Sequence, residues 1–152
     1  MYSSSAIHPK EILLVDDSPT DVMITKEAFQ FHNVICPLNV AEDGVEAIEY
    51  LRFKQQKGIE YLPNLIILDL NLPRKSGQEV LEEIKSDKVL KKIPVVILTT
   101  SKAQEDILKA YTLHANCFIT KPLDFNKFKN MIKTVIEFWL EVTTLPNHKG
   151  KQ

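Results

Sequence analysis

Three acidic residues of this chain follow short apolar segments: Asp16 and Asp17 end the segment "EILLVDD", and Asp69 ends the segment "LIILD". Carboxylates that are brought together repel one another and require a cation, and a hard divalent ion such as Mg²⁺ prefers oxygen ligands. Two further apolar segments, "PVVILTTS" and "CFITKP", end near a hydroxyl at Thr99 and an amine at Lys121. A hydroxyl and an amine can both hold the oxygens of a phosphoryl group. These residue types therefore indicate a site for a divalent cation and a transferred phosphoryl group.

The elements that position these residues follow from a regular alternation of apolar and amphipathic segments. Short apolar runs predict strands, and apolar residues at helical spacing predict the helices between them. The expected strands lie at 11–17, 38–41, 65–69, 93–101 and 116–122, and the expected helices at 18–31, 44–56, 76–87, 102–115 and 123–142. Such a succession of βα units predicts an α/β fold, a doubly wound (βα)5 parallel five-stranded sheet. Sites in these folds form outside the carboxyl ends of the strands, where the acids, Thr99 and Lys121 would all lie.

Local signals mark the first and last helices. Ser18 is a good N-cap, Pro19 suits the first helical position, and Asp21 suits the capping-box position. Asp124 is expected to cap the last helix. One apolar stripe of that helix suffices to cover the sheet: Phe125, Phe128, Ile132, Val135 and Trp139. The surplus of apolar side chains favours a dimer interface, whose candidate residues are Tyr111, Met131, Phe138, Trp139 and Val142.

Composition and charge bound the class of protein. The chain has 152 residues, 44% of them hydrophobic, and a net charge of −1, as for one globular domain with a substantial core. We expect this domain at 11–142, with tails at 1–10 and 143–152. The balanced charge predicts no binding to nucleic acid or to an anionic membrane, and we expect neither a secretory signal nor a bilayer-spanning segment. Cys36 and Cys117 lack metal-ligand spacing and read as reduced thiols, as in a cytoplasmic protein.

Missing motifs disfavour two other classes of site. The chain has only four glycines, and acids stand after the first strand, where an FMN-binding flavodoxin-like protein would need a phosphate loop. No serine lies in the G-x-S-x-G motif of hydrolases. A phosphoryl site built from acids therefore remains the favoured reading of the strand ends.

Four segments taken together resemble the receiver domain of two-component response regulators: "LLVDDS", "LIILDLNLPRKSG", "PVVILTTS" and "FITKP". The likeness covers residues 11 to about 140. Its spacing is specific, with 30 residues from Asp69 to Thr99 and 22 from Thr99 to Lys121. The resemblance implies the flavodoxin-like receiver fold and a signalling phosphoprotein that is not an enzyme. By this likeness Asp69 is the phosphoacceptor, Lys121 binds the phosphoryl group, and Thr99 and Phe118 form the switch pair.

The same resemblance implies a set of metal ligands. Mg²⁺ would be bound by Asp17, by Asp69 and by the backbone carbonyl of Asn71, and Asp16 would hold a metal-bound water. Asn71 and Ser101 occupy the positions that tune how fast water removes the phosphoryl group.

Three further segments are similar to the single-domain regulators that serve bacterial phytochromes, especially cyanobacterial ones: "VEAIEYL", the long connection to "PNLIILDLNLPRKSG", and the ending "FWLEVTTLP". This likeness implies a light-sensing, phytochrome-like histidine kinase as partner and a homodimer formed with the help of the last helix. Because the sequence ends soon after the last predicted helix, we also expect output through protein contacts, without an attached output domain. A docking module that keeps the receiver fold and works without phosphate remains the alternative, although the intact set of acids favours the phosphorylated switch.

Overall fold

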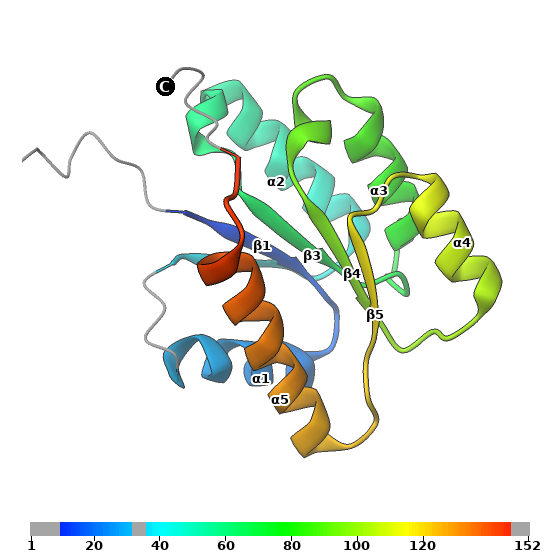
Figure 1. Cartoon of the computed structure of the whole chain (residues 1–152). Coiled ribbons are helices and arrows are strands. Elements are labelled where there is room, and N and C mark those ends of the chain that lie inside the picture. The colour runs from blue at the N-terminus through cyan, green and yellow to red at the C-terminus, as the bar shows by residue number, and fades with distance from the viewer. Residues whose placement is uncertain (1–9, 32–35, 147–152) are drawn as a thin grey trace, which may run out of the picture.

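A five-stranded parallel sheet forms the centre of the protein, as predicted (Figure 1). The computed structural model describes residues 10–31 and 36–146, so most of both predicted tails lies outside the described residues. The strand order is β2-β1-β3-β4-β5. The strands are β1 (Ile12–Val15), β2 (Leu38–Ala41), β3 (Leu65–Leu68), β4 (Val95–Thr99) and β5 (Cys117–Thr120). Because all pairs are parallel, the carboxyl ends of the strands meet at one edge of the sheet.

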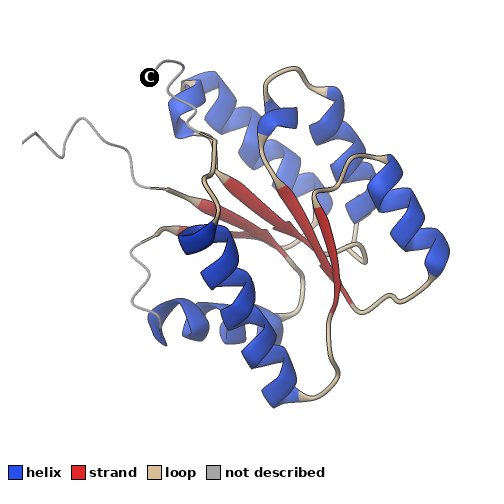
Figure 2. Cartoon of the chain, viewed as in Figure 1, coloured by secondary structure: helices blue, strands red, loops and turns tan. Residues whose placement is uncertain are grey.

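Helices cover both faces of this sheet (Figures 1 and 2). One face carries α1 (Pro19–Phe31) and α5 (Phe125–Ile136). The other carries α2 (Gly44–Lys57), α3 (Gly77–Ser86) and α4 (Gln104–Thr112). Short 3-10 helices lie at Ile59–Tyr61 and Leu90–Lys92. This is the predicted doubly wound (βα)5 arrangement. Within the ranges that the structure describes, no helix combines the length and the apolar character needed to cross a membrane.

The strands divide the hydrophobic core into two clusters, one on each face. In β1, Leu13 and Val15 pack toward α2 and α3, whereas Ile12 and Leu14 pack toward α1 and α5. The strands β3 and β4 alternate in the same way between the two clusters. A strand that buries both faces reads as a continuous apolar run, which is why "ILLV", "LIIL" and "VVIL" predicted the central strands correctly.

The last helix corrects one part of the sequence reading. Phe128, Ile132 and Val135 are buried as predicted, but the side chain of Phe125 is 53% exposed. Asp124 is the N-cap and accepts a hydrogen bond from the backbone of Lys127. Phe125 therefore occupies the first helical position, ahead of the part of α5 that packs on the sheet, and its predicted role in the covering stripe was wrong.

The chain also remains packed beyond the predicted end of the domain. The α-helix ends at Ile136 and continues as a π-helical segment, Glu137–Val142. Leu145 is buried in the cluster beneath α1 and α5, and the Asn64 side chain donates a hydrogen bond to the carbonyl of Pro146. Contacts with the rest of the fold therefore continue as far as Pro146, beyond the boundary that the sequence predicted at residue 142, and the mostly polar sequence after Val142 did not indicate them.

Asp87 joins α2 to the segment after α3. Its carboxylate accepts hydrogen bonds from the backbone of Val89 and Leu90 and from the Arg52 guanidinium at 2.7 Å. Burial opposes the charged form, but these bonds outweigh it and lower the pKa of Asp87 from 3.8 to about 2. Asp87 therefore stabilises the fold most strongly when it is ionised.

We expect Asp87→Ala to lower the free energy of unfolding at pH 7 by about 1 kcal/mol, allowing for screening by solvent. Because the folded pKa lies below the ordinary value, the difference from wild type should be complete above about pH 4 and should vanish as the pH falls through 2. Urea unfolding at a series of pH values measures it. Glu82→Ala, at an exposed position on α3, is the matched control. A difference that does not change with pH would contradict this role.

Candidate functional site

The three predicted acids come together at the carboxyl edge of the sheet. Asp16 and Asp17 follow β1, Asp69 follows β3, and their ligand oxygens lie within 4.8 Å of one another. The sheet ladder holds their backbone, because the Asp16 amide donates to Ala41 and the Asp69 amide donates to Val15. Asp16 is buried, the Asp69 side chain is 10% exposed, and Asp17 is open to solvent. The acidic site is therefore enclosed around Asp16 and Asp69 and open to solvent at Asp17.

Lys121 reaches the acids from the end of β5. Its Nζ lies 2.9 Å from Asp16 Oδ2, 3.0 Å from Asp69 Oδ2 and 2.8 Å from Asp21 Oδ2. The backbone amide of Lys121 donates to the carbonyl of Thr99 at 2.6 Å, which fixes the end of β5 beside the end of β4. The side chain is only 4% exposed. The predicted meeting of the amine and the acids is therefore present.

The charges of this site do not balance. Burial raises the pKa of the Asp16 carboxyl, and the hydrogen bond from Lys121 offsets that only in part. Burial also opposes the charge of Lys121, but its bonds to Asp21 and Asp16 and the charge of Asp69 raise the pKa of the ammonium above its usual value. One ammonium is shared among carboxylates and compensates none of them fully. Oxygen donors with excess negative charge fit a hard divalent cation.

A close backbone approach shapes the loop that follows Asp69. The Asn71 amide donates to Asp69 Oδ1 at 3.2 Å, and the Gly77 amide donates to the carbonyl of Leu70 at 2.9 Å. A Cβ at position 77 would lie 2.1 Å from the carbonyl oxygen of Asp69. Only glycine fits there, so α3 can begin directly against the loop that carries the acid. Whether the Asn71 carbonyl binds a metal stays a prediction.

The predicted switch and tuning residues lie around β4, β5 and α4. Thr99 is fully buried at the end of β4. Ser101 donates its hydroxyl to Asp106 of α4 at 2.6 Å, so this side chain is already engaged at the start of that helix. Phe118 is half-buried against the core cluster of α2 and α3, and its amide donates to the Tyr111 hydroxyl at 3.1 Å. Their roles in switching and in phosphoryl removal remain predictions.

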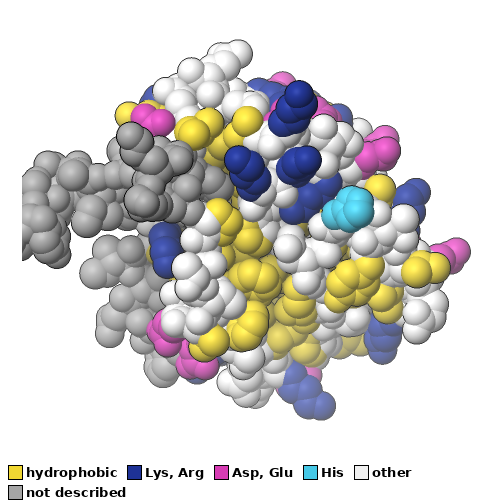
Figure 3. Space-filling view, turned by 45° about the horizontal axis from the view of Figure 1, so that its top comes forward, with side chains coloured by type: hydrophobic (Ala, Val, Ile, Leu, Met, Phe, Trp, Pro, Cys, Tyr) yellow, Lys and Arg dark blue, Asp and Glu magenta, His cyan; other side chains and the backbone are white. Residues whose placement is uncertain are grey.

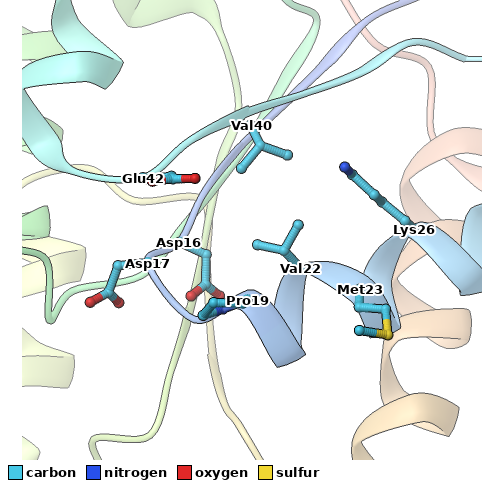
Figure 4. A pocket seen from close by; sticks show the side chains of 8 residues that line it. All are labelled: Asp16, Asp17, Pro19, Val22, Met23, Lys26, Val40 and Glu42. Carbon is cyan, nitrogen blue, oxygen red and sulfur yellow. The ribbon is translucent and has the colours of Figure 1, made fainter.

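A hollow of about 380 Å³ opens beside the acids, between α1 and β2. Figure 4 shows Asp16 and Asp17 at one end of it, with Val22, Met23 and Lys26 of α1 and Val40 of β2 further along. The exposed Asp17 therefore borders both the acid cluster and this hollow.

The predicted interface residues fall into two groups. Tyr111, Phe138 and Val142 are exposed, whereas Met131 and Trp139 pack partly against the core cluster of α1 and α5. Figure 3 shows hydrophobic side chains gathered on one face of the molecule, beside a group of Lys and Arg side chains. Further exposed apolar residues are Leu108 on α4, Leu123 in the loop before α5, and Phe125 at the start of α5.

Asp21 belongs to the site although the sequence reading gave it only a capping role. Its carboxylate makes the shortest of the three contacts to Lys121. A helix that begins directly after a strand places its first turn at the same edge of the sheet. The sequence did contain a signal for this role of Asp21, because the first turn of α1 directly follows Asp16 and Asp17.

The fold and this site together define a class of protein. A buried lysine and an acid cluster lie at the carboxyl edge of a (βα)5 sheet, and residues 12–133 match the response regulator receiver domain. The chain belongs to this family. Members are signalling proteins rather than enzymes, and receiver domains bind a divalent metal in the acidic pocket.

Similar proteins include regulators linked to phytochromes. The chain is 43% identical over 138 residues to the response regulator Rcp1 of Synechocystis, covering 91% of this chain and 94% of the relative. It is 39% identical to a probable methanogenesis regulatory protein, FilR2, of Methanothrix harundinacea, covering 87% and 84%. Among solved structures, the phosphorylated cyanobacterial phytochrome response regulator RcpA matches with a TM-score of 0.83 and 45% identity, covering 91% of this chain and 99% of that one. The Mn²⁺-bound form of Rcp1 matches with the same TM-score, 44% identity and the same coverage.

Proposed function

We propose that this protein accepts a phosphoryl group on Asp69 from a sensor histidine kinase and signals through protein contacts. The observation that carries the proposal is the position of the Asp69 carboxylate. It lies 3.0 Å from the Lys121 ammonium, within a cluster that also holds Asp16 and Asp17. An acid used only for docking would not need a buried lysine and two further acids around it, so the phosphate-independent docking module is the weaker alternative.

The proposed reaction uses the groups at the strand ends. A carboxylate oxygen of Asp69 bonds to the phosphorus of a phosphohistidine, while the bond from phosphorus to the kinase imidazole breaks and its electron pair stays on nitrogen. Mg²⁺, held by Asp17, Asp69, the Asn71 carbonyl and, through water, Asp16, would neutralise charge on the phosphoryl oxygens.

The signal arises from the charge that Asp69 gains, about −1.5 to −2 by analogy with other phosphorylated side chains. Lys121 pairs with one phosphoryl oxygen, and the buried Thr99 donates its hydroxyl to another. Movement of Thr99 leaves space for Phe118, already half-buried, to turn further inward. The surface formed by α4, β5 and α5 changes as a result, while Asn71 and Ser101 tune the loss of the phosphoryl group.

We further propose that the kinase is a phytochrome-type light sensor, on the basis of the similarity to Rcp1 and RcpA. The test uses a phytochrome-type kinase carrying labelled phosphohistidine, mixed with the protein in Mg²⁺. Label should move to this chain roughly tenfold or more faster than from a histidine kinase of unrelated input. Equal rates would contradict the light-sensing partner, and transfer from neither kinase would contradict the kinase route itself.

A homodimer is the third part of the proposal. Exposed apolar side chains lie on α4, at Leu108 and Tyr111, and after α5, at Phe138 and Val142. In a dimer they would be buried against the same side chains of a second copy of the chain. We expect light scattering at tens of micromolar to give twice the chain mass of 17.4 kDa.

Phe138→Lys should weaken this association by about 2 kcal/mol, roughly thirtyfold, because an aromatic anchor is replaced by a charge. Phe53→Lys is the matched control, since Phe53 is 59% exposed on α2 and Phe138 is 49% exposed. Light scattering across a dilution series measures both variants. A wild-type protein that stays monomeric, or a control that dissociates equally, would rule out the proposed interface.

A further inference from the structure

Asp21 forms an ion pair with Lys121 but is not one of the three clustered acids. Its Oδ2 lies 2.8 Å from Lys121 Nζ, whereas the group of possible metal ligands contains only Asp16, Asp17 and Asp69 among the described residues. The Asp21 side chain is 25% exposed and the Lys121 side chain 4%. Asp21 therefore contacts the phosphoryl-binding lysine without being placed to bind the cation.

The local structure of α1 directs this carboxylate toward the lysine. Ser18 Oγ accepts a hydrogen bond from the Asp21 amide, which fixes the first turn. In a full capping box the Asp21 side chain would accept from the Ser18 amide, but that amide donates to Asp16 Oδ1 instead. The start of α3 shows the complete form, in which the side chains of Ser76 and Glu79 both cap. Asp21 is thus free of the capping role that its position predicts.

The donors of Lys121 are fully used in this arrangement. A lysine ammonium has three N–H donors, and Nζ makes three hydrogen bonds, to Asp16, Asp21 and Asp69. A phosphoryl oxygen can accept a hydrogen bond from Lys121 only if the bond to one of these carboxylates breaks. A cation bound among Asp16, Asp17 and Asp69 would neutralise two of the lysine's three partners, but Asp21 would keep its full charge.

We propose that Asp21 is a positioning residue that holds Lys121 in the unphosphorylated state and competes with the phosphoryl group for its ammonium. This inference rests on the proposed function of Asp69. Asp21 thereby sets how strongly the site favours its phosphorylated form. It also supports cation binding, because its negative charge offsets part of the positive charge that Lys121 holds against Asp16 and Asp69, the two acids that a cation would use.

The test is Asp21→Asn, which keeps the shape and a hydrogen-bond acceptor but removes the charge. Calorimetry first measures Mg²⁺ affinity, and then the affinity for beryllofluoride, a mimic of the phosphoryl group, at saturating Mg²⁺. We expect beryllofluoride to bind about fivefold more tightly and Mg²⁺ about twofold more weakly than in wild type. Glu27→Gln removes the same charge from an exposed position on α1 and should change neither affinity by as much as twofold.

Opposite shifts of the two affinities separate competition from damage to the fold, because a distorted site would lose affinity for both ligands. Unchanged or weaker beryllofluoride binding by Asp21→Asn, with normal binding by wild type, would overturn this inference and leave the proposed function intact. Equal shifts in Glu27→Gln would overturn it too, since the effect would then be one of net charge. If wild type itself bound no beryllofluoride in Mg²⁺, the proposed function and this inference would both fail.

Discussion

Asp69→Asn is expected to reduce phosphorylation from about one phosphoryl group per chain to none detectable, because an amide is not a nucleophile for phosphorus. The fold should survive the change. Asparagine has nearly the same shape, and its single side-chain oxygen can still accept one of the two hydrogen bonds that Asp69 receives, which come from the Asn71 amide at Oδ1 and from Lys121 at Oδ2. Removing one of several crowded negative charges should leave the metal-free protein at least as stable as wild type.

The measurement is incorporation of labelled phosphate from a small acyl phosphate in Mg²⁺, together with the unfolding midpoint of each protein. Asp124→Asn is the matched control. Asp124 caps α5 and is not one of the three clustered acids, and asparagine caps a helix as well as aspartate does. The control should be labelled like wild type. Full labelling of Asp69→Asn would show that another residue accepts the phosphoryl group.

Lys121→Met should have the largest effect on stability. It removes the cation that three carboxylates share, and Asp16 would remain buried with no positive partner among the contacts described. Breaking a buried ion pair by removing one partner costs about 3 kcal/mol or more. A bound divalent cation would supply the missing positive charge. We therefore expect the free energy of unfolding of Lys121→Met to fall strongly in a chelator. At least half of this loss should be recovered in millimolar Mg²⁺.

Chemical unfolding with and without Mg²⁺ tests this expectation. Lys85→Met provides the control, because Lys85 is half-buried but bonds to the carbonyls of Lys91 and Ile93 rather than to acids. Lys85→Met should lose the same amount of stability with and without Mg²⁺. If Lys121→Met gained no more stability from Mg²⁺ than wild type does, the cation would not be taking the place of the lysine charge.

Sequence reasoning located the site because the physics of a parallel sheet is simple. Strands buried on both faces read as unbroken apolar runs, and their carboxyl ends must share an edge. Asp16, Asp69 and Lys121 could therefore be brought together from widely separated positions.

The misses have local causes. Asp21 already fitted a capping pattern, and its second use became visible only once the side chain of Lys121 was placed across the sheet. Phe125 fitted the period of the last helix, but periodicity does not say how far along the sheet a helix extends. Leu145 stands alone among polar residues after the last helix, so no pattern indicated that it is buried.

The central claim is that Asp69 accepts a phosphoryl group in a cation-dependent site. Its most direct test is to incubate the wild-type protein with a small acyl phosphate, in Mg²⁺ or in a chelator, and to map the modified residue by peptide mass spectrometry. We predict one phosphoryl group per chain, carried by the peptide that contains Asp69, in Mg²⁺ only. Absence of the modification in Mg²⁺, its presence on another residue, or equal modification in the chelator would contradict the claim.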